Sequence, residues 1–191
     1  MVALLLLAGP PTLGARQSPQ GPHPRQEAIT AFQRNDLESA ERLSLAWLET
    51  QPHDEEIHRL LGMVRMTKGL ALEARERPRS EYLAVYRQAL DALLEAERLA
   101  GGAPRPDLNH AVGYVLLTDG RYAEAEARFD EAIGETPGNF VLYRLRGNCR
   151  LERGRYPEAA ADLRKAVALN ARDWTSRVLH ARALYLVGQG Q

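Results

Sequence analysis

The chain has 191 residues, of which 45% are apolar and 26% are charged, a composition that suits one folded domain or about four to five short repeats. Lys and Arg together number 25, as do Asp and Glu, so no overall charge favours nucleic acid or an anionic membrane as a partner. The single cysteine, Cys149, excludes an intramolecular disulfide and a thiolate metal site.

The first residues of the chain have the pattern of a targeting segment. Residues 2–8 form an apolar run of the length of a secretory core, too short to span a bilayer, and small residues follow as far as Ala15. We therefore expect residues 1–15 to be a signal peptide and the protein to be periplasmic or secreted. The alternative is an apolar tail without a targeting role, on a cytoplasmic protein. The proline-containing residues 16–23 are typical of a linker.

The rest of the chain is dominated by a repeat. A series of small and large residues recurs 34 positions later in the same order: Gly113, Gly120, Ala125, Phe129 and Ala132 become Gly147, Gly154, Ala159, Leu163 and Ala166. A fixed period of this length with small residues at these offsets is typical of antiparallel helix pairs stacked in a row. The sequence therefore predicts an all-α fold, a right-handed α-solenoid of about four and a half repeats.

In chain order, the predicted array over residues 24–191 divides into units at 24–54, 55–105, 106–139, 140–173 and a partial unit at 174–191. The second unit contains an insertion of about 15 residues, roughly Leu70 to Ala84, that is rich in good helix formers. We expect both of its helices to be extended by about two turns, with Pro78 ending the first and Ser80 capping the second.

The partial unit holds one predicted helix, from Trp174 to about Val187, on which Leu179, Leu184 and Leu186 would be partly uncovered. Terminal repeats normally carry a polar outer face. We therefore expect that this helix caps the array, or that the chain is a fragment of a longer protein.

Small residues at two positions of each unit explain how the helices could pack. Glycine or alanine at the eighth and twentieth positions lets the two helices of a unit approach closely, and we expect Phe129 and Leu163 to fill the seam with the following unit. Gly120 and Gly154 should end their helices in the left-handed conformation, which glycine adopts without strain.

These features resemble the tetratricopeptide repeat family across about residues 24–190. The most specific runs are Tyr143–Gly147 and Ala159–Ala166, which are similar to a common bacterial variant. The resemblance suggests an ion pair between Arg146 and Asp162 across the two helices; two solvated charges are the alternative. The family's tryptophan at position four is missing, which marks a divergent member.

The resemblance also implies a binding groove, because this family lines its concave face with set positions of each first helix. In this sequence those positions hold Arg59, Met63, Met66, His110, Tyr114, Leu117, Arg144, Asn148, Leu151, Arg182 and Tyr185. Methionine and tyrosine offer adaptable apolar contact and arginine binds carboxylates, so the groove suits an extended or helical peptide. Alternatively, several of these residues only pack against the adjacent helix.

No motif for catalysis, cofactor binding or metal binding is present: the five histidines are scattered, and phosphate-binding loops and nucleophile motifs are missing. We therefore expect no enzyme, no cofactor and no small-molecule substrate. The expected partner is a protein or peptide, with no nucleic acid and no membrane contact beyond the N-terminal signal.

The predicted function is a non-enzymatic protein–protein interaction scaffold that binds a peptide or partner segment in the concave groove. The alternative is a regulatory or substrate-presenting segment of a larger enzyme whose catalytic part is not in this chain. The extended hairpin, with charged residues on both sides of Pro78, is a second candidate contact site.

Overall fold

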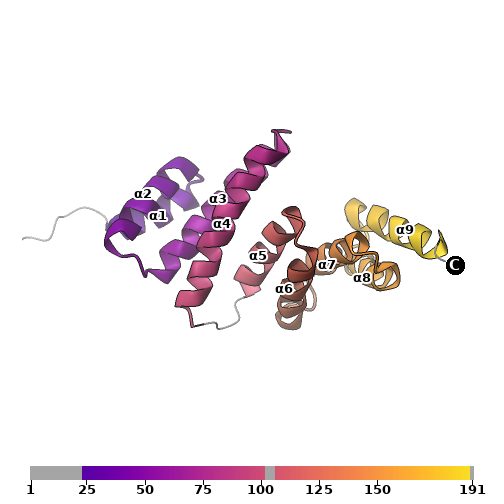
Figure 1. Ribbon diagram of the computed structural model, residues 1–191. Coiled ribbons are helices and arrows are strands. Elements are labelled where there is room, and N and C mark those ends of the chain that lie inside the picture. The colour runs from indigo at the N-terminus through magenta and orange to yellow at the C-terminus, as the bar shows by residue number, and fades with distance from the viewer. Residues whose placement is uncertain (1–22, 102–105, 190–191) are drawn as a thin grey trace, which may run out of the picture.

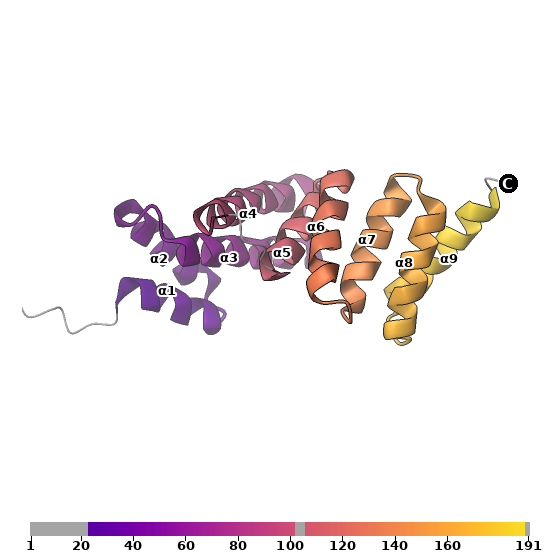
Figure 2. The same ribbon diagram turned by 90° about the horizontal axis from the view of Figure 1, so that it is seen from below.

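The computed structural model describes residues 23–101 and 106–189, so the candidate signal peptide and all but the last residue of the candidate linker lie outside the described residues. Every regular element in the described part is an α-helix. The helices are α1 Pro24–Gln33, α2 Leu37–Thr50, α3 Glu55–Ala74, α4 Arg79–Leu99, α5 Pro106–Thr118, α6 Tyr122–Glu135, α7 Phe140–Glu152, α8 Tyr156–Leu169 and α9 Trp174–Gln189. They pack as consecutive pairs that follow one another in a row (Figures 1 and 2).

The buried apolar residues are spread along this row. One cluster lies among α1, α2 and α3, a second extends from α4 to α7, and a third joins α7, α8 and α9. Each pair therefore buries its apolar surface against its neighbours, as expected of a solenoid.

The pair α3 and α4 is the longest, with 20 and 21 residues. Its turn differs from the prediction, because α3 ends before Pro78 and Ser80 lies inside the first turn of α4. Glu76 ends α3 instead: it adopts a left-handed conformation with φ 54°, and the following Arg77 N–H donates to the Leu72 carbonyl at 3.1 Å.

The glycines of the first helices lie directly beneath large side chains of the second helices. A Cβ placed on Gly113 would lie 2.7 Å from Cε1 of Phe129, and one on Gly147 would lie 2.8 Å from Cγ of Leu163. Glycine is therefore required for close approach of the two helices, as predicted. The same large side chains also belong to clusters that include the following unit, Phe129 with Leu142 and Cys149 of α7 and Leu163 with Ala183 of α9, in agreement with their expected place at that seam.

The short turns between paired helices follow the predicted chemistry. Gly120 and Gly154 have φ values of 83° and 73°, which confirms the left-handed helix ends expected at both positions. Asn35 has the same conformation at the end of α1, with φ 59°. At the other end of the array, α9 continues through Gly188, beyond the end predicted from the sequence.

Partly buried ion pairs join some neighbouring pairs of helices. Between α2 and α3, Glu41 accepts hydrogen bonds from Arg65 at 2.8 Å and Lys68 at 2.7 Å. Between α4 and α5, by contrast, Leu90 and Leu116 are both buried in the central cluster.

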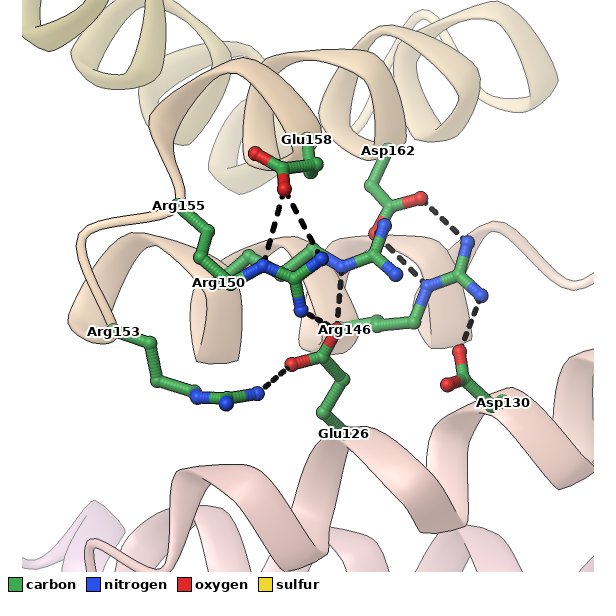
Figure 3. A network of polar contacts seen from close by, with 8 residues as sticks. All are labelled: Glu126, Asp130, Arg146, Arg150, Arg153, Arg155, Glu158 and Asp162. Carbon is green, nitrogen blue, oxygen red and sulfur yellow. Dashed lines mark hydrogen bonds and ion pairs between the residues drawn. The ribbon is translucent and has the colours of Figure 1, made fainter.

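The most extensive network lies between α6, α7 and α8 (Figure 3). The Arg146 guanidinium donates to both oxygens of Asp162, at 2.9 and 2.6 Å, which confirms the predicted pair. Arg150 bridges the two acids, donating to Glu126 and Asp162 at 2.8 Å each. The bidentate pair joins α7 to α8, and the bonds from Arg150 to Glu126 and from Arg146 to Asp130 join α7 to α6, so the network connects all three helices.

Candidate functional site

The first helix of each pair lies on the inner side of the row. α1, α3, α5, α7 and α9 each contact the next first helix in the series, whereas no two of the second helices α2, α4, α6 and α8 contact each other within the described residues. On a curved stack, helices on the inner side are closer together than helices on the outer side. Because the first helices contact one another and the second helices do not, the first helices form the inner side. The positions expected to line a groove are on these inner helices.

A largely apolar cleft of about 220 Å³ lies across three of the inner helices. We call it the methionine cleft; its lining residues are Met63, Met66 and Leu70 of α3, His110, Ala111 and Tyr114 of α5, and Val141, Arg144 and Leu145 of α7. It brings together five of the residues predicted from the sequence: Met63, Met66, His110, Tyr114 and Arg144. Side chains from three successive pairs thus form one continuous surface.

A second, more polar cleft of about 370 Å³ adjoins the first and shares Tyr114 and Leu145 with it. We call it the tyrosine cleft; its lining residues are Glu73, Arg79, Tyr82, Tyr114, Leu117, Thr118, Tyr122, Leu145, Asn148 and Glu152. It contains the predicted residues Leu117 and Asn148. The two clefts together make a groove that changes from apolar to polar along its length.

The wall between the two clefts is held by hydrogen bonds to one carboxylate. The hydroxyl groups of Tyr86 and Tyr114 both donate to Oε2 of Glu73, at 2.8 and 3.4 Å. Burial and the nearby Glu73 carboxylate raise the pKa of Tyr114, so its hydroxyl remains a donor at neutral pH. The Tyr114 ring also makes an edge contact with the Tyr86 ring, with centroids 6.0 Å apart, and these two contacts restrain its orientation, which reduces the entropic cost of binding.

The only histidine of the methionine cleft is uncharged at neutral pH. Burial lowers the pKa of His110, and the positive charge of Arg144 lowers it further. Because the His110 ring is uncharged, its part of the cleft lining can contact an apolar group without burying a charge.

The arginines predicted to bind a partner's carboxylate are engaged within the chain. Arg144 donates to Asp173 at 3.2 Å, and Arg182 donates to Glu152 at 3.0 Å. Arg59 lies 3.8 Å from a Glu56 oxygen and lines a separate cleft between α1 and α3. The centre of the groove therefore recognises a partner through apolar and aromatic contact more than through arginine.

Two of the remaining predicted residues lie elsewhere. Leu151 is only 3% exposed, because it is packed in a cluster with Leu163 and Ala183, so its assignment to the groove is corrected. Tyr185 is 67% exposed on α9, outside both clefts.

The sequence analysis named the extended hairpin as a second, separate contact site, whereas the structure brings residues of the longer pair into the groove itself. Leu70 and Glu73 lie in the extra turns of α3, and Tyr82 lies in the extra turn of α4. The helix-forming composition of the insertion indicated that the two helices are longer. The spacing of a regular repeat, however, gives no groove position to residues of an insertion.

Metal sites formed by acidic, histidine and cysteine side chains, and helices that cross a membrane, are both missing from the described part of the chain. No three His, Cys, Asp or Glu side chains of residues 23–101 and 106–189 are placed to hold a metal ion. Cys149 is fully buried, and burial raises the pKa of its thiol to about 12. Among the helices described, none combines the length and apolar character needed to cross a bilayer.

Comparison with known proteins agrees with this architecture. The sequence profile of the tetratricopeptide repeat matches residues 82–140 and 110–176. No curated protein sequence matches the chain.

Several solved structures are similar. MamA from Desulfovibrio magneticus RS-1, from residue 41 to its end, superimposes with a TM-score of 0.64 and 17% identity, covering 87% of this chain and 90% of that one. A thermophilic tetratricopeptide repeat protein of Thermus thermophilus superimposes with a TM-score of 0.57 and 23% identity, and the match covers 89% of this chain and 84% of that one. The tetratricopeptide repeat domain of Arabidopsis OM64 superimposes with a TM-score of 0.51 and 25% identity, and the match covers 66% of this chain and 96% of that domain.

The fold and the groove define an α-solenoid of the kind that generally serves as a non-catalytic interaction scaffold. The chain is a tetratricopeptide repeat protein.

Proposed function

We propose that the protein is a non-enzymatic scaffold that binds a segment of a protein partner along the methionine and tyrosine clefts. The observation that supports this most strongly is the methionine cleft itself. It is apolar, lies on the inner side of the solenoid, and is built by side chains from three successive pairs. Binding pockets have this composition, and methionine side chains adapt to partners of different shape.

The two clefts suggest the chemistry of the bound segment. An apolar side chain of the partner fits the methionine cleft, where His110 is neutral and Arg144 is held by Asp173. Polar neighbours fit the tyrosine cleft, where Glu73, Arg79 and Asn148 supply charged and polar groups beside Tyr82 and Tyr122. Such a segment would bind as a helix or an extended peptide with one apolar anchor.

The compartment in which the partner is met depends on targeting. If residues 1–15 act as a signal peptide, the partner is periplasmic or secreted. Expression of the native gene followed by N-terminal sequencing of the mature protein tests this: a start near Arg16 supports export, and retention of residues 1–15 contradicts it.

Site-specific photo-crosslinking in the native host tests the proposed groove. A benzoylphenylalanine residue in place of Met66 should capture a discrete partner protein, and one in place of Asn148 should capture the same partner. A matched probe in place of Ala127, which is exposed on α6, should not. Equal capture from positions 66 and 127, or capture from position 127 alone, would show that the partner binds elsewhere.

A further inference from the structure

Apart from its first residue, the chain has methionine in one place only. Met63 and Met66 are the two methionines other than Met1, whereas alanine, leucine and valine make up most of the buried core. Both lie on α3, and their spacing of three residues places them on the same side of the helix. Both are partly buried and line the methionine cleft, which has a volume of about 220 Å³. Two thioether groups therefore share one cleft.

A third donor group lines the same cleft from the next first helix. His110 of α5 stands beside the two methionines in the lining, and α3 and α5 are in direct contact (Figure 2). Among the residues that the structure describes, none forms a hydrogen bond with the His110 ring. A neutral imidazole has one ring nitrogen with a free lone pair, which can bind a metal ion. The His110 ring is therefore a partly buried polar group that a ligand could satisfy.

The chemistry of these donors favours a soft ion with a single charge. Thioether and neutral imidazole groups carry no charge, and the described residues that line the cleft include no aspartate, glutamate or cysteine. Zinc is generally bound by thiolate, imidazole and carboxylate groups, whereas thioethers favour Cu⁺. The cost of moving an ion out of water rises with the square of its charge. A set of neutral donors in an apolar cleft therefore suits Cu⁺ better than a divalent ion.

The surrounding side chains allow the donors to converge on one ion. Residues three apart on a helix have Cβ atoms about 5–6 Å from each other, and methionine has three rotatable bonds. The sulfurs of Met63 and Met66 can therefore be brought together by rotation of the side chains. Arg144 adds a positive charge to the lining, but its guanidinium is paired with Asp173 at 3.2 Å, which offsets its repulsion of a bound cation.

We propose that Met63, Met66 and His110 form a binding site for Cu⁺, with two thioether sulfurs and one imidazole nitrogen as its ligands. The site lies across the first helices of two successive pairs, so a bound ion also connects α3 to α5. It is distinct from any site formed by His, Cys, Asp and Glu alone, because two of its three ligands are thioethers. Binding of the ion does not depend on the proposed protein partner.

Titration of the whole chain with Cu⁺ under argon tests the site. The ion is supplied as its acetonitrile complex, and the protein carries ¹³C-methyl methionine, so that each methionine gives its own signal. We expect the Met63 and Met66 signals to shift together and to reach their final positions at one equivalent of Cu⁺, while the Met1 signal stays unchanged. Zinc at the same concentrations should shift neither of the two signals.

Variants of the three ligands test each donor separately. Met63→Leu and Met66→Leu preserve volume and apolar character, and His110→Gln preserves a polar side chain. Each should weaken Cu⁺ binding, measured by competition with the chelator bathocuproine disulfonate, by at least about ten-fold, because even the loss of a residue that supports a metal ligand usually costs this much. His53→Gln is the matched control, since His53 is exposed in the turn before α3, and it should bind as tightly as the wild type.

Three results would overturn the proposal. One is that the Met63 and Met66 signals stay unchanged in excess Cu⁺, or move only in proportion to the Met1 signal. Another is that any of the three ligand variants binds Cu⁺ as tightly as the wild type. The third is that zinc shifts the Met63 and Met66 signals at the same concentration as Cu⁺, because the site would then not select a soft ion.

Discussion

Replacing Gly113 by alanine probes the close approach on which each helix pair depends. The added methyl carbon would lie 2.7, 3.0 and 3.1 Å from Cε1, Cζ and Cδ1 of Phe129. Phe129 is fully buried and belongs to the central cluster, so its ring cannot withdraw without displacing its neighbours. Overpacking of this kind costs roughly 1–3 kcal/mol. Alanine recovers about 1 kcal/mol relative to glycine through its helix propensity. We therefore expect the free energy of unfolding to fall by up to about 2 kcal/mol.

Gly134→Ala is the matched control, because Gly134 lies in α6 with nothing within 4 Å of the position of a Cβ. It should raise the free energy of unfolding by up to about 1 kcal/mol. Urea denaturation followed by circular dichroism at 222 nm compares the two variants with the wild type. If Gly113→Ala proved as stable as Gly134→Ala, the close contact between Gly113 and Phe129 would be refuted.

Three further predictions follow from the turns, the ion network and the buried thiol. Glu76→Gly relieves the left-handed conformation that ends α3 and should raise the melting temperature by several degrees, corresponding to about 1 kcal/mol; an unchanged or lower melting temperature contradicts this. Burial alone would raise the pKa of the Glu126 carboxyl, but Arg150, Arg155 and Arg153 outweigh it and lower the pKa below the ordinary 4.5. The stability that Glu126 contributes is therefore present above pH 4.5 and lost as the pH falls through the folded pKa, so Glu126→Ala should cost about 3 kcal/mol at pH 7 and less in acid. A deficit that is the same at pH 7 and pH 3 in urea denaturation would exclude this role. The Cys149 thiol should react with a disulfide reagent only after urea unfolds the chain, and rapid reaction of the native protein would show that it is accessible.

The repeat spacing was enough to predict the class of fold and the close packing within pairs. Glycines at fixed positions have few explanations other than a left-handed turn, as at Gly120, or close approach, as at Gly147. The pair between Arg146 and Asp162 was also predictable, because the resemblance to a bacterial variant of the family pointed to it. The contribution of Arg153 and Arg155 to the same network was not, since they lie at the turn and reach Glu126 of the preceding unit.

The groove was only partly predictable for the same reason. Met63, Met66 and Tyr114 follow from their places on the first helices, and the structure brings them together. Whether a side chain at one of these positions is exposed depends on how closely the next first helix packs against it. Leu151 is buried because it packs in a cluster with Ala183 of α9. The reach of Glu73 into the tyrosine cleft depends on the length of α3, which the regular repeat does not encode.

The most direct test of binding in the methionine cleft uses the methionines themselves. The chain has three, at positions 1, 63 and 66, so a protein labelled with ¹³C-methyl methionine gives a spectrum in which two of three signals report on the cleft. The partner captured from position 66 is added in increments. We predict that the Met63 and Met66 methyl signals shift together and saturate at the stoichiometry of the complex. A complex that forms while both signals stay unchanged would show that the partner does not enter the cleft.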